Sequence, residues 1–409
     1  MDHFVSHPLF ILGLILFAGY FAGRAAHFLH LPRISGYIVM GLVLSPSTNG
    51  IISHPQIDTL FSFTSEIALG FIAYSIGGSL MMSRIRGLGK GILWINLAEG
   101  FGSFVCTCLA VFMAGYFLPP VISENGSTFI SVILILGGIS VATAPAATMA
   151  VIHELRAIGP LTTTLLGVVA LDDALSIIIF TGAITIASQL LFSNADSSLL
   201  LQGLMVIIGA IGVGLLGGFI LAKFLEPAKR PETNIMLTLG AIFLVSSVSN
   251  NFGFSPLLAT MMMGFVIINK VKHADELFFQ LDCIEETIFC LFFTLAAAHF
   301  DTKVFVSSSF LGIVLMVGRF IGKFGGTLLG GKISKTSPNI YKNLGIALLP
   351  QAGLALGLIF LAKPILPVEI FEILFSALLV SIILNEIISP PLVKWAITRA
   401  GEKNPDPDR

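Results

Sequence analysis

The chain has 409 residues, of which 55% are hydrophobic and 11% are charged, and its formal net charge is -1. A soluble domain carries about 25% charged residues, so this composition indicates an integral membrane protein. The near-zero charge and the lack of a basic run argue against a nucleic-acid partner. The four cysteines lie in or beside apolar segments, without the spacing of a disulfide framework or a zinc site, so we expect buried free thiols.

About thirteen apolar segments approach or exceed the length of about 20 residues that a membrane helix needs. The chain is therefore predicted to be an all-α polytopic membrane protein with one transmembrane domain over residues 1–409. The first segment follows a stretch without a basic region, so we expect it to be retained and not cleaved as a signal. The predicted spans, before a short cytoplasmic tail at 397–409, are 9–29, 35–53, 59–82, 91–117, 128–152, 158–191, 199–224, 233–251, 255–270, 283–300, 304–332, 342–363 and 367–396.

The basic residues predict the orientation. If the N-terminus lies outside, the cytoplasmic loops and tail receive nearly all of the 22 Lys and Arg residues. Lys303 and Lys363 fall outside, and Arg319 and Lys323 lie within the eleventh span. Because cytoplasmic loops are enriched in Lys and Arg, we predict an outer N-terminus, an odd number of spans and a cytoplasmic C-terminus.

Two predicted spans are interrupted. The fifth contains SVATAPAAT at 140–148, and the twelfth contains LPQAGLALG at 349–357. Pro145 and Pro350 each remove a backbone donor, and freed backbone groups are tolerated at that depth only where protein or water satisfies them. A simple kink is the alternative interpretation of either interruption alone.

The spacing of the two interruptions favours an inverted repeat. If repeat one covers about 35–191 and repeat two about 255–396, each interruption falls in the fourth span of a five-span repeat. An odd number of spans inverts the topology of the second repeat, which is the plan of transporters whose site lies where discontinuous helices meet. The prediction rests on this pattern, because the two halves show no convincing residue-by-residue identity.

The sixth span carries two adjacent carboxylates, Asp172 and Asp173, near its centre. A charged residue at that depth costs roughly 2.5–3.5 kcal/mol on insertion scales, and two adjacent acids also repel each other. A chain that bears this cost usually uses it to bind a cation or a proton. We therefore predict a cation/proton site at this pair.

The eleventh span contains Arg319 and Lys323, which are four residues apart and share one helix face. We expect one of them to pair with an aspartate of the sixth span. Lysine can release its proton whereas arginine cannot, so Lys323 is the candidate for a switchable partner and Arg319 for a permanent counter-charge. The alternative for both is snorkelling toward the membrane surface.

Other polar residues are weaker candidates. Glu99 is left open between lining a pore and hydrogen-bonded packing, and the loop histidines, such as His153 and His273, are weak candidates for pH sensors. The remaining expectations are an interfacial Glu66, a helix cap at Asn250 and Asn251, a cytoplasmic funnel at Glu285 and Glu286, and a helix end at Glu386.

The set of motifs resembles the cation/proton antiporter superfamily, and in particular its CPA2-type sodium/proton antiporters. The resemblance covers nearly the whole chain and is carried by SVATAPAAT, LDDALSI, GRFIGK and LLPQAGLALGL, in that order. An isolated Asp-Asp pair is a weak signal, but this order and topology make the set specific.

The resemblance implies roles for individual residues. Asp173 is similar to the cation- and proton-carrying aspartate, and Asp172 to the one that alternates between the cation and a salt bridge to Lys323. The implied cation ligands are Asp172, Asp173 and Thr143, together with Ser140. The remaining helix-break residues that the resemblance implies are Ala144, Pro145, Pro350 and Gln351.

The resemblance also implies the activity and assembly. We expect exchange of protons for Na⁺, with Li⁺ or K⁺ as alternatives, by alternating access and with about two protons per cation. A homodimer is implied, in which a six-helix core domain moves against a dimerisation domain in a bacterial inner membrane. The expected partners are the cation, protons and the lipid bilayer, and no cofactor or enzymatic activity is expected.

Two departures from the family pattern bear on the cation. Several relatives have an Asp where this chain has Ala144, and many have Arg-Gly-Glu where this chain has Pro350, Gln351 and Ala352. The residues therefore do not name the cation, and a K⁺/H⁺ exchanger or a carrier of another small ion remains an alternative. A cation channel is less favoured because no filter-like loop is present in the sequence, and an intramembrane aspartyl protease would need a second aspartate facing the first.

Overall fold

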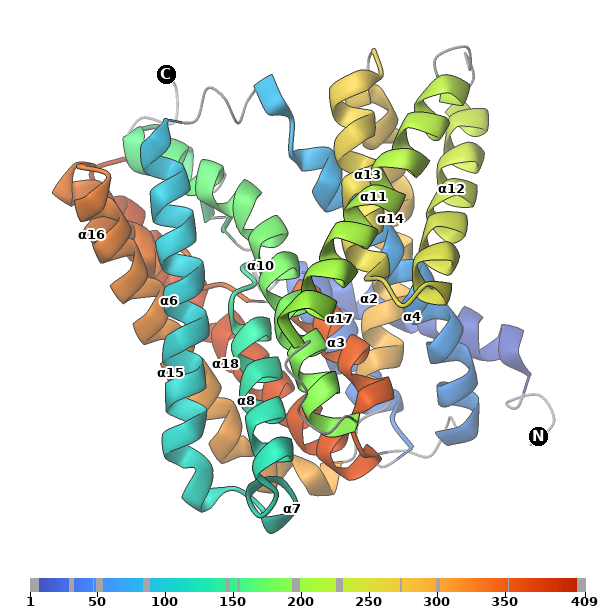
Figure 1. Cartoon of the computed structure of the whole chain (residues 1–409), viewed down its shortest axis with the longest axis horizontal. Coiled ribbons are helices and arrows are strands. Elements are labelled where there is room, and N and C mark those ends of the chain that lie inside the picture. Colours follow the sequence, from blue (N-terminus) through green and yellow to red (C-terminus); the bar gives the residue numbers. More distant parts are fainter. Residues whose placement is uncertain are drawn as a thin grey trace. The chain divides into compact units, whose positions relative to one another are not determined.

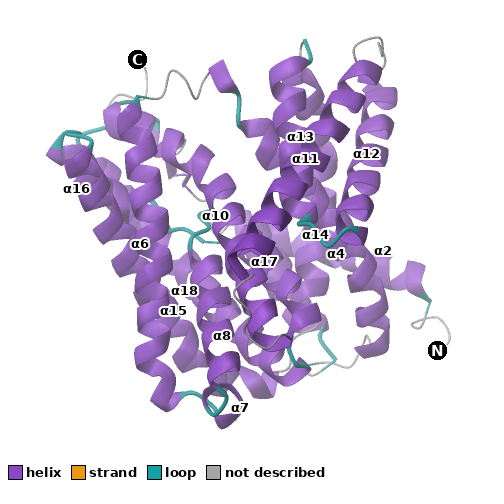
Figure 2. Ribbon diagram, viewed as in Figure 1, coloured by secondary structure: helices purple, strands orange, loops and turns teal. Residues whose placement is uncertain are grey.

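The computed structural model describes residues 7–28, 33–46, 48, 54–83, 89–144, 148–149, 151–152, 155–192, 199–225, 231–272, 274–298, 302–351 and 353–402. Helix is the only regular structure within these ranges, as predicted (Figure 2). The chain divides into two compact units, each built from two separate stretches (Figure 1). The first unit comprises residues 1–82 and 201–303, and the second comprises residues 83–200 and 304–409.

Within the described ranges, 7 helices are long and apolar enough to cross a membrane. These spans are Pro8–Phe28, Lys90–Phe117, Pro160–Phe192, Leu204–Leu225, Glu232–Asn251, Ser308–Ile333 and Val368–Arg399. Three shorter apolar helices are Gly126–Ser140, Pro256–Lys270 and Leu354–Ile365. The count of about thirteen crossings stays a prediction for the other segments.

The first unit is a bundle of helices with close backbone contacts. Its helices are α2 (Pro8–Phe28), α3 (Arg33–Leu44), α4 (His54–Ser79), α11 (Leu199–Leu225), α12 (Pro231–Asn251), α13 (Pro256–Lys270) and α14 (Ala274–Ala298). A Cβ added at Gly77 would collide with the carbonyl of Met261, and one added at Gly264 would collide with that of Tyr74. Small residues at such crossings let helix backbones pack closely, which is a common device in membranes.

The second unit contains the two predicted interruptions and the aspartate pair. Its helices are α6 (Lys90–Ala114), α7 (Pro120–Ser123), α8 (Gly126–Ser140), α10 (Pro160–Phe192), α15 (Thr302–Ile333), α16 (Pro338–Ala347), α17 (Gly353–Ala362) and α18 (Val368–Arg399). Short 3₁₀ turns follow α6 at Gly115–Phe117 and α17 at Lys363–Ile365. A Cβ at Gly102 of α6 would collide with the backbone of Gly322 on α15, so these two helices approach closely.

Both predicted interruptions are present in the second unit. α8 ends at Ser140, and the backbone is non-helical over 142–144. α16 ends at Ala347 and α17 begins at Gly353. The two breaks lie against each other, because the N–H of Ala144 donates to the carbonyl of Pro350 at 2.8 Å. Discontinuous helices that meet at their breaks are therefore confirmed, whereas Pro145 lies outside the described residues.

Three local predictions are wrong. α3 ends at Leu44, where the second span was predicted to continue to 53. α14 begins at Ala274, so Glu285 and Glu286 lie inside a helix and do not open one. α18 continues to Arg399 with Pro390 and Pro391 inside it, so Glu386 does not mark a helix end. Prolines are tolerated within membrane helices because neighbouring groups satisfy the freed backbone atoms.

Candidate functional site

The centre of the candidate site is the ammonium group of Lys323 on α15, which is 0% exposed. Its Nζ lies 2.7 Å from Oε2 of Glu99 and 2.8 Å from Oδ2 of Asp172. It also donates to the hydroxyl of Thr143 at 2.8 Å. These three partners match the three N–H donors of an ammonium. Burial excludes snorkelling for Lys323, and its pairing with Asp172 agrees with the sequence analysis.

Thr143 links the ammonium to the two helix breaks. It lies in the non-helical stretch after α8 and is buried. Its Oγ1 accepts from Lys323 and donates to the carbonyl of Leu348, 3.5 Å away at the end of α16. The predicted break residue Thr143 therefore belongs to the same polar cluster as Asp172.

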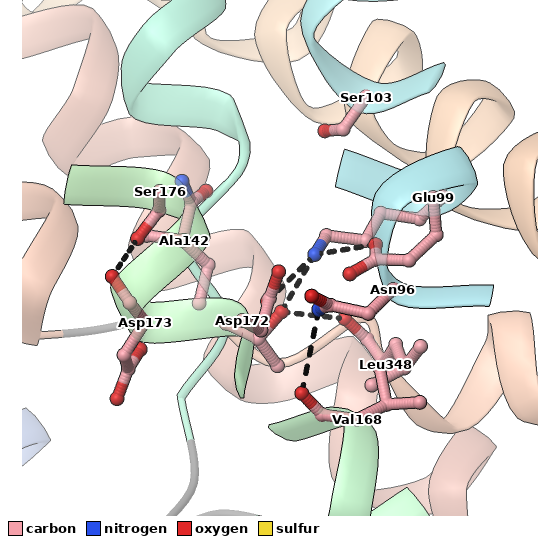
Figure 3. A network of polar contacts seen from close by, with 12 residues as sticks. Asn96, Glu99, Ser103, Ala142, Val168, Asp172, Asp173, Ser176 and Leu348 are labelled. Atoms are coloured by element: carbon pink, nitrogen blue, oxygen red, sulfur yellow. Dashed lines mark hydrogen bonds and ion pairs between the residues drawn. The ribbon is translucent and has the colours of Figure 1, made fainter. Parts of the chain in front are cut away.

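The two adjacent aspartates face different surroundings. Neighbours on an α-helix point about 100° apart, and Figure 3 shows the carboxylate of Asp172 directed at the ammonium and that of Asp173 directed away from it. Asp172 is fully buried and Asp173 is half-buried. In each of them Oδ1 has no hydrogen-bond partner within the described residues. Of the predicted cation ligands, Asp172 and Thr143 meet at Lys323, and Asp173 does not join them there.

Glu99 is the member of the cluster that the sequence analysis left undecided. It is 0% exposed on α6, and its Oε2 lies 2.7 Å from the same ammonium that Asp172 contacts from α10. Asn96, Glu99, Ser103 and Thr107 are all buried, and they recur every three or four residues along α6. Such spacing places them on one face of a helix, and a polar face at membrane depth is the signal that points to Glu99.

Arg319 neutralises a different set of negative groups. Its guanidinium is buried and donates only to backbone carbonyls among the contacts of the described residues. Those carbonyls belong to Ser140 and Ala142 at 2.9 Å, Pro350 at 3.2 Å, Leu348 at 3.4 Å, and Leu349. The C-terminal ends of helices carry unsatisfied carbonyls and partial negative charge. Arg319 is thus a counter-charge for the ends of α8 and α16, and the aspartate partner is Lys323.

The remaining predicted break residues hold the backbone in place. Ser140 Oγ donates to the carbonyl of Gly137 at 2.6 Å, and Ser103 Oγ donates to the carbonyl of Ser140 at 2.8 Å. Gln351 is buried, and its Nε2 donates to the carbonyl of Ile139 at 3.2 Å. Ser140 and Gln351 therefore tie α6, α8 and the second break together.

Three other candidates have different positions. Glu66 is exposed but lies near the middle of α4, so its interfacial position stays a prediction. Asn250 and Asn251 lie in the last turn of α12. Glu286 of the first unit forms an ion pair with Arg33 and accepts from the hydroxyl of Tyr37 at 3.1 Å. His153 and His273 lie outside the described residues. Among the described cysteines, Cys106, Cys108 and Cys290 are free thiols as expected, but only Cys290 is buried and the other two are half-buried.

The cluster offers hard oxygen ligands, of the kind that small cations bind, around the ammonium of Lys323. Carboxylate, hydroxyl and carbonyl oxygens are the ligands that hard metal ions prefer. The carbonyls of both breaks lie beside the cluster, held by Arg319. A monovalent cation at Asp172 would replace one of the ion pairs of Lys323. The geometry therefore suits an exchange of one positive charge for another.

Comparison with known proteins gives the family of the chain. A family model described as "Sodium/hydrogen exchanger, transmembrane" matches residues 12–395. The Na(+)/H(+)-K(+) antiporter GerN of Bacillus cereus is 20% identical over 402 residues, which cover 94% of this chain and 95% of that protein. Na(+)/H(+) antiporter 1 of Methanocaldococcus jannaschii is 26% identical over 274 residues, 65% of this chain and 61% of that protein.

Solved structures show the same fold. The sodium proton antiporter MjNhaP1 from Methanocaldococcus jannaschii at pH 8 matches with a TM-score of 0.78 and 21% identity, over 98% of this chain and 99% of that one. A map of the same antiporter from electron microscopy matches with a TM-score of 0.71, over 97% and 98% of the two chains. With the family model spanning residues 12–395, the chain belongs to the sodium/hydrogen exchanger family and is an integral membrane protein.

Proposed function

We propose that this protein exchanges protons for a monovalent cation across a membrane by alternating access, with Na⁺ as the first candidate. The observation that carries the proposal is the buried ion pair of Lys323 and Asp172 beside two helix breaks that meet in the second unit. Buried charges at membrane depth mark ion pathways and proton relays, and broken helices mark the sites of secondary transporters.

The proposed exchange uses the two aspartates in different roles. Asp173 carries either a proton or a share of the cation, because its Oδ1 has no partner within the described residues. Asp172 alternates between Lys323 and the cation. Protons and cation compete for the same carboxylates, so binding of one releases the other. The proposal requires no bound cofactor and no enzymatic step.

The proposal also covers which cation is transported and how the protein assembles. The name of GerN includes both Na⁺ and K⁺, so K⁺/H⁺ exchange is the alternative to Na⁺/H⁺ exchange here, and Li⁺ is a further candidate. We also propose a homodimer in a bacterial inner membrane, with the N-terminus outside and the C-terminus in the cytoplasm. In each subunit the second unit, which contains six of the predicted spans, would be the moving core.

The test is cation-driven proton flux in proteoliposomes that contain a pH dye. Asp173→Asn removes the proposed carrier charge while it preserves the side-chain shape, and we expect it to abolish exchange. Glu124→Gln makes the same kind of change at an exposed residue of the second unit and should leave exchange unchanged. Normal exchange by the Asp173→Asn variant would defeat the assignment.

The same vesicles separate the rival functions. A panel of Na⁺, Li⁺ and K⁺ identifies the cation, and an imposed membrane potential shows whether the exchange moves net charge. Saturable flux that requires a counter-ion indicates a carrier, whereas flux that persists without any proton gradient or counter-flow indicates a channel.

A further inference from the structure

Glu99 is placed where it can bind Lys323 independently of Asp172. The two carboxylates come from different helices, α6 and α10, and they contact the same ammonium at 2.7 Å and 2.8 Å. All three side chains are fully buried. The ammonium is therefore paired with both acids at once, and it need not move to stay paired if Asp172 turns toward another cation.

The surroundings of Glu99 leave it one basic partner. From α10 it faces Asp172, and from α15 it faces Lys323, while the guanidinium of Arg319 on α15 is engaged by carbonyls of the two breaks. The hydrogen bonds between α8 and this face of α6 join Ser140 to Ser103, and neither residue titrates. Oε1 of Glu99 has no hydrogen-bond partner within the described part of the chain.

A lysine with a single acid partner would impede the proposed exchange. A cation that takes Asp172 would leave Lys323 as an unpaired charge in a buried site, which is strongly unfavourable. The lysine would then hold on to Asp172, or would release its proton. A second carboxylate within contact distance removes this conflict, because the ammonium keeps an ion pair throughout.

We propose that Glu99 is a positioning residue that keeps Lys323 charged and paired while a cation occupies Asp172. This inference rests on the proposed function and adds a third acid to its site. The proton of Lys323 then stays on the lysine, so the exchanged protons come from the carboxylates. Charge balances within the cluster, since Glu99 and Lys323 form one neutral pair and the cation and Asp172 form another.

The test is Glu99→Gln, which keeps the size of the side chain and removes its charge. Near neutral pH we expect the Na⁺ concentration for half-maximal flux to rise at least about tenfold, because one ionic partner of the lysine is lost. The dependence of the half-maximal concentration on pH should also differ from that of the wild type, because the variant lacks one titratable carboxylate of the cluster.

Two variants serve as controls. Thr107→Val changes a buried polar residue two turns further along the same face of α6. The Oγ1 of Thr107 has no hydrogen-bond partner among the described residues, so the flux of this variant and its pH dependence should match those of the wild type. Glu99→Asp retains a carboxylate and should restore most of the wild-type pH dependence. A merely structural role for Glu99 would change protein yield or unfolding temperature without changing the pH dependence.

The outcomes separate this inference from the proposed function. Absence of cation-driven proton flux in the wild type defeats the proposed function and the inference that rests on it. Wild-type exchange together with an unchanged half-maximal concentration and pH dependence in Glu99→Gln overturns only the role of Glu99. If Glu99→Gln does not transport, the unfolding temperature is measured at increasing Na⁺ concentrations in place of flux. If the unfolding temperatures of the variant and of the wild type rise over the same range of Na⁺ concentrations, the inference is overturned.

Discussion

Lys323 and Arg319 lie one turn apart on α15, yet they neutralise different kinds of negative charge. Lys323 contacts two carboxylates and a hydroxyl, and Arg319 contacts backbone carbonyls. The difference follows from side-chain chemistry, because a guanidinium offers five donors in a planar fork whereas an ammonium is a compact charge with three. An exchangeable partner and a fixed support are thereby placed on one helix face.

The fixed role of Arg319 gives a prediction at the residue level. Arg319→Lys keeps the charge but cannot reach the carbonyls of both breaks, so buried acceptors would lose their donors. Each such loss costs about 1–3 kcal/mol, and we expect a clearly lower unfolding temperature in detergent. Arg24→Lys makes the same change at an exposed residue, and its free energy of unfolding should stay within about 0.5 kcal/mol of that of the wild type. Equal unfolding temperatures for both variants would show that the carbonyl contacts contribute nothing.

At the level of elements, α10 is tied at its start to the end of the chain. Glu402, which follows α18, accepts from the N–H of Leu161 at 2.5 Å and from the N–H and hydroxyl of Thr162 at 2.7 Å. Its carboxylate therefore satisfies donors in the first turn of the helix that carries the aspartate pair. A carboxylate at this end also interacts favourably with the helix dipole.

This cap predicts a measurable loss of stability. Glu402→Gln keeps one acceptor oxygen but removes the charge and the second acceptor, and loss of a helix cap costs about 0.5–2 kcal/mol. We expect a lower unfolding temperature and faster proteolysis at the C-terminal end of α18, since the contact that Glu402 makes with α10 is weakened. Glu124→Gln, at an exposed position, is the matched control. An unchanged unfolding temperature would contradict the capping role.

Much of this architecture is predictable from local pattern, and the rest depends on packing. Proline and small residues at 140–148 and 349–357 predict the two breaks, because they remove backbone donors within apolar segments. The partner of Glu99 is not predictable in this way. Its contact with Lys323 requires α6 and α15 to approach at Gly102 and Gly322, and this approach is a tertiary property. The helix end predicted at Glu386 fails because packing maintains α18 through two prolines.

At the scale of the whole molecule, each predicted repeat is divided between the two units in the same way. Repeat one, 35–191, contributes α3 and α4 to the first unit and α6, α8 and α10 to the second. Repeat two, 255–396, contributes α13 and α14 to the first unit and the helices from α15 to α18 to the second. This common division favours the inverted-repeat plan, which stays a prediction, as does motion between the two units.

The orientation of the chain is the prediction that every proposed transport direction depends on. The excess of Lys and Arg in alternate loops predicts that the loop before α8 lies outside and the loop before α16 inside. In a variant without the native cysteines, a membrane-impermeant maleimide added to intact cells should label Gly126→Cys and not Lys335→Cys. Gly126 is the first residue of α8 and has open space around it, and Lys335 lies in the turn that follows α15. Opening the cells should make Lys335→Cys reactive, and this step shows that the residue is accessible once the reagent crosses. Labelling of Lys335→Cys alone in intact cells would show that the topology is the reverse of the predicted one. The face of the membrane from which the aspartates receive each ion would then be reversed as well.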